Sequence, residues 1–343
     1  MTPGGRRHMR RGGLWMAIGA TVLAALLGFA RAWGWGKQQE PPSSAQVPAA
    51  PSDVDPERLR AHVRMLSETF HPRDSSHPEN LERAANYIAD ALKKAGGHVE
   101  SQPYRVGGND YRNIIARFGP EAGERLIVGA HYDAVQGTPG ADDNASGVAG
   151  LLELARVLGQ KPPPLRVDLV AFTLEEPPHF RTSQMGSAVH ARSLKEAGVR
   201  VRAMLSLEML GTYSDAPDSQ EYPIAALRLR YPDKGHFIGV VGLPGDGGLT
   251  DTVAAAMRAG SPLPVESLNA PRMVTGVDLS DHSSFWDQGF RAVMVTDTAF
   301  MRNPRYHTSE DTWDTLDYAR MAQAVQGVYA AVRTLAEGPP PKH

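Results

Sequence analysis

The feature that most constrains the fold is a set of short apolar runs separated by longer stretches of helical periodicity. The runs LIVGA (126–130) and VDLVAF (167–172) are apolar at all positions except Asp168, which is typical of strands buried on both faces. The stretches between them repeat their apolar residues at a helical period. This alternation predicts an α/β fold in which a mixed, largely parallel β-sheet is sandwiched by helices.

The pattern predicts where the elements lie. Helices are expected at about 55–70, 78–95, 146–158 and 185–197, after Gly248, and at about 316–335. Strands are expected at about 97–105, 111–118, 125–130, 166–173, 202–208, 237–243 and 291–297. A domain of roughly 280 residues buries about 75% of its unfolded surface, so it is stable without disulfides. The chain contains no cysteine, so oxygen and nitrogen atoms must hold any metal.

The N-terminus differs in composition from the rest of the chain. Residues 1–37 hold six of the 36 lysines and arginines and no acidic residue, and residues 14–30 form a charge-free apolar run. This run predicts an N-terminal hydrophobic helix that is either an uncleaved single-pass anchor or a cleaved signal peptide. Because the positive end stays in the cytoplasm, the rest is expected to be exported to the periplasmic or extracellular face of the cytoplasmic membrane.

These shifts in composition divide the chain. Residues 1–36 are predicted to be the signal or membrane anchor, 37–54 a linker rich in Pro, Ser and Ala, 55–337 the folded domain, and 338–343 a tail. Beyond residue 37 the chain has 30 basic and 38 acidic residues, which argues against nucleic acid as a partner. Contact with a membrane is expected through the N-terminal helix only. The oligomeric state is left open.

Side chains that bind metals follow several of the predicted strands. The carboxyl ends of parallel strands meet at one edge of an α/β sheet, which is where ligands bind. The turn GADDNASG (140–147) adds two adjacent acids in front of a helix. The residues placed at this edge are His131, Asp133, Asp142, Asp143, Glu175, Glu176, Glu208, Tyr306 and His307.

Each residue has an ordinary explanation on its own, but the ordered set favours a metal. One acid before a helix is a common N-cap, whereas a second adjacent acid is better explained by a cation that it can bridge. Glu175 and Glu176 precede two prolines and point apart on an extended segment. One of them can therefore bind a metal while the other acts as a base. Imidazole and carboxylate ligands fit zinc without excluding other divalent ions.

The ordered set resembles the co-catalytic dizinc aminopeptidase family, which includes bacterial leucyl aminopeptidase and the glutamate carboxypeptidase-like metallopeptidases. The resemblance covers about residues 55–335. It rests on His-x-Asp, GADDNASG, Glu-Glu, an acid after a strand, Ser-Asp-His-x-x-Phe, and Tyr-His followed by Asp-Thr. It implies a zinc-exopeptidase-like fold and a zinc-dependent exopeptidase. An aminopeptidase that acts on a peptide or aminoacyl substrate is the favoured form.

The resemblance also implies two Zn²⁺ ions per chain and a role for each matching residue. The metal ligands would be His131 and Glu208 for one ion, Glu176 and His307 for the other, and Asp143 between them. The catalytic residues would be Glu175 as general base at a metal-bridging hydroxide, Asp133 as the group that orients His131, and Tyr306 as a group that polarises the tetrahedral intermediate. Asp142 is expected to be structural.

Two departures from the family pattern leave questions open. The segment PPHFRTSQMGS (177–187) replaces a short Gly-rich turn, so side-chain preference is not predicted, and Glu208 stands where many relatives have Asp, which bears on metal number. His282 is expected either to support a ligand or to cap a helix. The alternatives are a glutaminyl-cyclase-like acyltransferase with one zinc and a non-catalytic peptidase-fold ectodomain. Carboxypeptidase or dipeptidase action also stays open.

Overall fold

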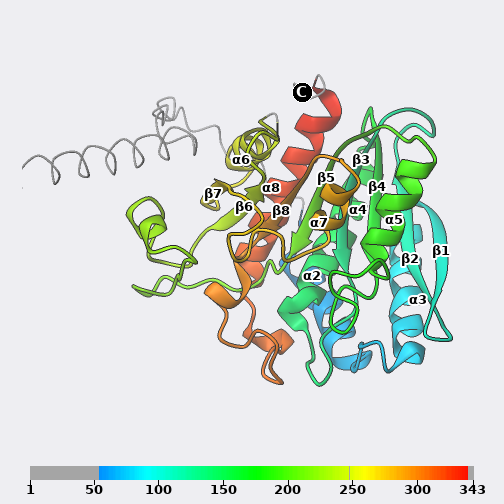
Figure 1. The fold of residues 1–343 in the computed structure, drawn as a ribbon, viewed down its shortest axis with the longest axis horizontal. Helices are drawn as coiled ribbons and strands as arrows, with labels where there is room; N and C mark the ends of the chain where they lie inside the picture. Colours follow the sequence, from blue (N-terminus) through cyan, green and yellow to red (C-terminus); the bar gives the residue numbers. More distant parts are fainter. Residues whose placement is uncertain (1–53, 247, 339–343) are drawn as a thin grey trace, which may run out of the picture. The chain divides into compact units, whose positions relative to one another are not determined.

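The computed structural model describes residues 54–246 and 248–338 (Figure 1). In this part of the chain, eight strands form one sheet in the order β1-β2-β4-β3-β5-β8-β6-β7. The predicted N-terminal hydrophobic helix and most of the predicted linker lie outside these residues. Within them, no helix combines the length and the apolar character that a membrane span requires.

The sheet is mixed, as predicted, and its parallel strands lie mainly in the centre. β4, β3, β5 and β8 are mutually parallel neighbours. β2 pairs antiparallel with β1 and β4, whereas β6 runs antiparallel to β8 and parallel to β7. The strands are β1 (His98–Val106), β2 (Asn109–Phe118), β3 (Arg125–His131), β4 (Arg166–Phe172), β5 (Val201–Glu208), β6 (Ile238–Gly242), β7 (Val265–Asn269) and β8 (Ala292–Thr296).

Helices cover both faces of the sheet, which explains the consecutive apolar residues of its central strands. In β4, Leu169 and Ala171 join the larger core with α2, α3, α4, α6 and α8, while Val170 and Phe172 join a smaller core with α5 and α7. The helices are α2 (Pro56–Arg64), α3 (Pro78–Lys94), α4 (Gly147–Gln160), α5 (Gly186–Glu196), α6 (Leu249–Gly260), α7 (His282–Asp287) and α8 (Tyr318–Glu337).

The sequence pattern missed two short elements and overextended one helix. β7 has one well-buried residue, Val265, so it lacks the apolar run that marks the central strands. α7 is only six residues long, too short for a periodic pattern to be recognised. The helix predicted at 55–70 is regular only to Arg64 and continues as a wider turn over Met65–Thr69.

Two long segments without strands adjoin the carboxyl ends of the central strands. Residues 209–237 follow β5, and residues 297–317 follow β8. In Figure 1 the first segment, in yellow-green, extends away from the sheet near β6 and β7. The two segments contain only short turns such as Ala225–Leu229 and Ala299–Met301. They bring polar and aromatic side chains to the edge of the sheet where the predicted site lies.

Candidate metal centre

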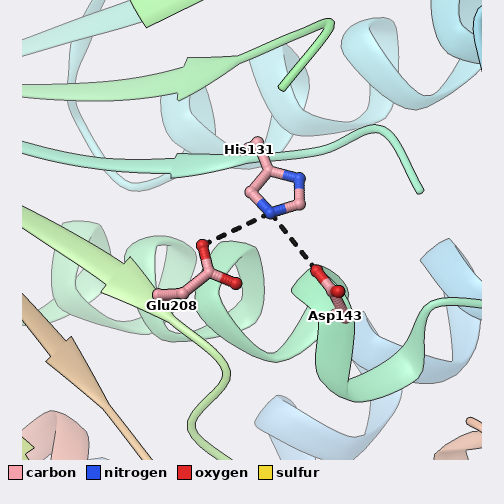
Figure 2. Close-up of side chains that lie close together, drawn as sticks. All are labelled: His131, Asp143 and Glu208. Carbon is pink, nitrogen blue, oxygen red and sulfur yellow. Dashed lines mark ion pairs between the residues drawn. The ribbon is translucent and has the colours of Figure 1, made fainter. Parts of the chain in front are cut away.

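Two parallel neighbouring strands end on side chains of the site. His131 is the last residue of β3, and Glu208 is the last residue of β5. Figure 2 shows the imidazole of His131 between two carboxylates. Its Nε2 atom lies 3.4 Å from Oε2 of Glu208 and 3.3 Å from Oδ1 of Asp143. All three side chains are buried, and their spacing allows them to share one cation.

Asp143 also faces a second histidine. Its Oδ2 atom lies 3.1 Å from Nε2 of His307, and the same nitrogen lies 3.5 Å from Oε2 of Glu176. Asp143 therefore offers one carboxylate oxygen to each histidine. A carboxylate that bridges two cations needs this arrangement.

The loop that carries Asp143 is tied down on both sides. The turn over residues 141–146 is broken at Asp143, where φ is −100° and ψ is 94°, and α4 starts only at Gly147. The carboxylate of Asp311 accepts the backbone N–H groups of both aspartates, at 2.9 and 3.1 Å. The side chain of Asn144 donates to the carbonyl of Leu207 and accepts the N–H of Met209. These bonds fix the loop against the end of β5.

Asp133 holds two parts of the site together. Its carboxylate oxygens accept the backbone N–H groups of Glu175 and Glu176, at 3.1 and 3.0 Å. Its backbone carbonyl lies 3.2 Å from Nδ1 of His131, whereas the nearer carboxylate oxygen is 3.7 Å away. The contact expected between Asp133 and His131 is thus made by the main chain. The carboxylate of Asp133 positions the glutamate pair.

Charge in this cluster is unbalanced toward the negative. Burial raises the pKa of Glu175 well above its ordinary value, the charge of His131 opposes the rise, and Glu176 and Glu208 add to it. Burial, and then the charge of Asp143, raises the pKa of Glu176 to about 8. Two imidazoles do not neutralise four carboxylates. The electrostatics favour additional positive charge among them.

The residues present fit a metal. Buried Oδ1 of Asp143 accepts no hydrogen bond from any described residue, which is unusual for a buried carboxylate oxygen. Imidazole nitrogen and carboxylate oxygen are ordinary zinc ligands. Three groups have ligand atoms within 4.8 Å of one another: His131 with Asp143 and Glu208, His131 with Glu175 and Glu176, and Asp143 with Glu176 and His307.

Tyr306 lies at the open side of this cluster. Its ring stacks on His307, with centroids 3.7 Å apart and an interplanar angle of 18°. Burial raises the pKa of Tyr306, so its hydroxyl stays protonated at neutral pH. The side chain of His307 is 32% exposed, against 8% or less for the other predicted metal ligands. Access to the cluster is therefore from the side of Tyr306 and His307.

Sequence reasoning gave no role to two residues that support the ligands. Ser280 donates from its hydroxyl to Oε2 of Glu208 at 2.6 Å, and Asp311 holds the backbone of the GADDNASG turn. Both residues belong to motifs that carry the family resemblance, Ser-Asp-His and Asp-Thr. Their positions in the sequence do not indicate which residues they contact. His282 is the first residue of α7 and bonds to the carbonyl of Val277, so Asp281 rather than His282 stands at the N-cap.

A mixed sheet with imidazole and carboxylate side chains at the carboxyl ends of its parallel strands is an arrangement that suits a metal-dependent hydrolase of the α/β class. The sequence profile of Peptidase family M28 matches residues 113–332. The chain belongs to this family and is a metallopeptidase.

Similar proteins agree with this assignment. The chain is 47% identical over 290 residues to the uncharacterized protein YfbL of Escherichia coli K12. The alignment covers 82% of this chain and 89% of YfbL. It is 26% identical over 296 residues to leucine aminopeptidase 1 of Grosmannia clavigera, covering 81% and 67% of the two chains. BSAP, a zinc aminopeptidase from Bacillus subtilis, has the same fold, with a TM-score of 0.66, 17% identity and coverage of 82% and 95%.

Proposed function

We propose that this protein is a zinc-dependent aminopeptidase that works with two zinc ions per chain. The observation that carries the proposal is the carboxylate of Asp143, which presents Oδ1 to His131 and Oδ2 to His307. Membership of Peptidase family M28 supports peptide hydrolysis. The names of its relatives, leucine aminopeptidase and zinc aminopeptidase, support action at the N-terminal bond with zinc.

The proposed ligand sets follow the two groups of side chains around Asp143. His131 and Glu208 would hold one ion, Glu176 and His307 would hold the other, and Asp143 would contribute one carboxylate oxygen to each. When bound, the ions supply Lewis-acid activation of a water molecule and of the scissile carbonyl. Ser280 and Asp133 keep Glu208 and Glu176 in place through the hydrogen bonds described above.

Glu175 is the proposed general base. Its carboxylate accepts a proton from the attacking water as the new C–O bond forms, and returns that proton to the amine nitrogen as the C–N bond breaks. Burial favours the protonated form of Glu175, which makes the carboxylate a stronger base than an exposed glutamate. The backbone bond from Glu175 to Asp133 holds this side chain at the edge of the cluster.

Tyr306 is the proposed electrophilic group. It lies against His307 and lines the same cavity as Glu208, so it stands beside both proposed metal positions. A protonated phenol there can donate a hydrogen bond to the carbonyl oxygen as negative charge develops on it.

The test measures metal and activity in one sample. Chelation is expected to abolish hydrolysis of amino-acid arylamides, zinc add-back to restore it, and mass spectrometry to count two zinc ions. Substrates blocked at the N-terminus are expected to be inert, which separates aminopeptidase from carboxypeptidase action. One zinc, with cyclisation of an N-terminal glutamine in which its α-amine displaces ammonia from its side-chain amide, would favour the glutaminyl-cyclase-like alternative. Two zinc ions without turnover of any peptide would favour a binding ectodomain.

We further propose that residues 1–36 export the chain and tether it to the membrane, with 37–54 as linker, 55–337 as catalytic domain and 338–343 as tail. The charge-free run 14–30 behind four arginines supports this arrangement. Fractionation of cells that express the full chain, with mass spectrometry of the mature N-terminus, distinguishes an uncleaved anchor from a cleaved signal. Recovery in the cytosol with an intact N-terminus would contradict export.

A further inference from the structure

A mostly apolar cavity adjoins the metal centre. Glu208 and Tyr306 of the site form part of its wall, together with residues of β6, β7 and β8. Its volume is about 100 Å³. An apolar cavity of about 150 Å³ accommodates a benzene ring, so this one takes a single side chain. The apolar and aromatic part of its wall includes Tyr222, Tyr231, Phe237, Val241, Leu279 and Met294.

One further carboxylate lines this cavity. Glu266 is the second residue of β7 and is only partly exposed. Burial raises its pKa, and the charges of Arg258, Arg230 and His236 oppose that rise from a distance. Neither an ion pair nor a hydrogen bond joins the Glu266 carboxylate to another residue in the described part of the chain.

The three basic groups whose charge acts on Glu266 each have another partner, and the two other titratable groups near it, Tyr222 and Tyr231, are neutral phenols whose hydroxyls donate to the carbonyls of Pro232 and Ser267. Arg258 donates to the carbonyl of Val265 at 2.9 and 2.6 Å. Arg230 lies over the ring of Tyr231, 5.4 Å from its centroid, and Nδ1 of His236 is 3.0 Å from the carbonyl of Lys234. The cavity thus combines apolar walls with a carboxylate that has no close counter-ion.

We propose that Glu266 makes this cavity selective for the side chain of an N-terminal lysine or arginine. The inference rests on the proposed aminopeptidase function, because the cavity is the one that Glu208 and Tyr306 help to line. The aliphatic stem of such a side chain packs on Phe237 and Met294 while its charged end pairs with Glu266. An apolar side chain of the same length leaves the carboxylate desolvated and unpaired, which costs binding.

The experiment compares zinc-loaded wild type with Glu266→Gln and with a matched control, Glu221→Gln, at an exposed position in residues 209–237. The substrates are the lysyl, arginyl, norleucyl and methionyl anilides. Wild type is expected to favour lysyl and arginyl over norleucyl substrates by about tenfold or more in kcat/KM, the usual size of a charge-assisted bond. Glu266→Gln is expected to remove this preference, because the cationic substrates lose their charged partner and the norleucyl substrate no longer buries an unpaired carboxylate. Glu221→Gln is expected to retain it.

Equal or better turnover of norleucyl substrate by wild type, with a ratio that Glu266→Gln does not change, would overturn the inference and leave the proposed function standing. Absence of turnover with every substrate would instead count against the proposed function. In that case calorimetric binding of lysine amide and norleucine amide decides the inference, since equal affinities in wild type overturn it. The ratio of kcat/KM for the lysyl and norleucyl substrates is measured on the wild-type protein. The inference can therefore be tested even if Glu266→Gln does not fold.

Discussion

Two buried acidic clusters meet at the dipeptide Asp142-Asp143, and their surroundings differ. We call them the framework cluster, which supports the loops around the site, and the metal-site cluster, which contains the proposed metal ligands and general base. Both lie in the interior, and neither contains a lysine. The framework cluster consists of Asp142, Asp297 and Asp311, and the metal-site cluster consists of Asp143, Glu175, Glu176 and Glu208.

The protein's own donors satisfy the framework cluster. Asp142 accepts the N–H of Gly211 and the side-chain amide of Asn303, each at 2.9 Å. Asp297 accepts the N–H groups of Thr212 and Ala299, at 2.8 and 3.0 Å. These carboxylates therefore serve as acceptors that join the GADDNASG turn to residues 209–237 and 297–317.

The metal-site cluster lacks such donors. Oδ1 of Asp143 accepts no hydrogen bond among the described residues, and Glu208 receives one from Ser280. Burying a carboxylate without donors is costly unless a cation compensates for it. The comparison therefore separates acids that the protein's own donors satisfy from acids proposed to bind metal, and the adjacent residues Asp142 and Asp143 fall on opposite sides. Substitutions can break or sharpen this difference.

The largest effect is expected for Asp143→Asn. This change removes the charge that both proposed ions share, so zinc content should fall below two per chain and activity should drop to the uncatalysed background. Mass spectrometry and arylamide hydrolysis of the same sample provide the measurement. Full zinc content with wild-type activity would show that Asp143 belongs with the framework cluster.

A smaller effect is expected for Glu175→Gln. The amide cannot accept the proton of the attacking water, so kcat should fall by about 10²- to 10⁴-fold, the usual range for a lost general base. Zinc content should not change, because the substitution leaves the proposed ligands intact. Glu196→Gln, at an exposed position near the end of α5, is the matched control. Wild-type kcat in Glu175→Gln would remove this residue from the mechanism.

A still smaller effect on activity is expected for Asp311→Asn. Asp311 belongs to the framework cluster and affects the metal-site cluster because it holds the backbone of Asp143. Asparagine has one oxygen for the two backbone N–H groups that Asp311 accepts, so the free energy of unfolding should fall by about 1–3 kcal/mol. Zinc affinity should weaken by about 10- to 100-fold, as is common when a ligand loses its support. Denaturant unfolding and competition with a zinc chelator measure the two effects. Exposed Asp314→Asn should change neither.

The smallest effect on zinc content and activity is expected for Asp142→Asn. The amide keeps an oxygen for the N–H of Gly211 but offers an NH₂ group where Oδ2 accepts the hydroxyl of Thr212 and the amide of Asn303, so the free energy of unfolding should fall by about 1–3 kcal/mol. Zinc content and kcat should match wild type. The same substitution one residue later, Asp143→Asn, is expected to remove zinc and activity. A different outcome for the two variants would therefore be due to the surroundings of each aspartate and not to the residue type. Loss of zinc in Asp142→Asn would erase the distinction between the clusters.

Part of the fold was predictable because it depends on local pattern. The runs at 126–130 and 167–172 are apolar at every position except Asp168, and the structure has β3 and β4 there. β7 and α7 were missed, because residues 265–269 and 282–287 are held by neighbours rather than by a periodicity of their own. The predicted metal ligands form groups whose ligand atoms lie within 4.8 Å of one another, since strand ends fix their side of the sheet.

By itself, the sequence determined the ligand chemistry and the order of the ligands. Without cysteine, thiolate ligands are excluded, and the histidines and acids after the strands are expected to meet at one edge of a parallel sheet. The family resemblance predicted that Asp143 rather than Asp142 lies between the metal ligands, and the tertiary structure shows the carboxylate of Asp143 facing both histidines. It also decided that Asp133 uses its carbonyl for His131, and that Glu266 lines a cavity beside the site. The orientation of a side chain depends on contacts with residues far away in the chain, which no local pattern encodes.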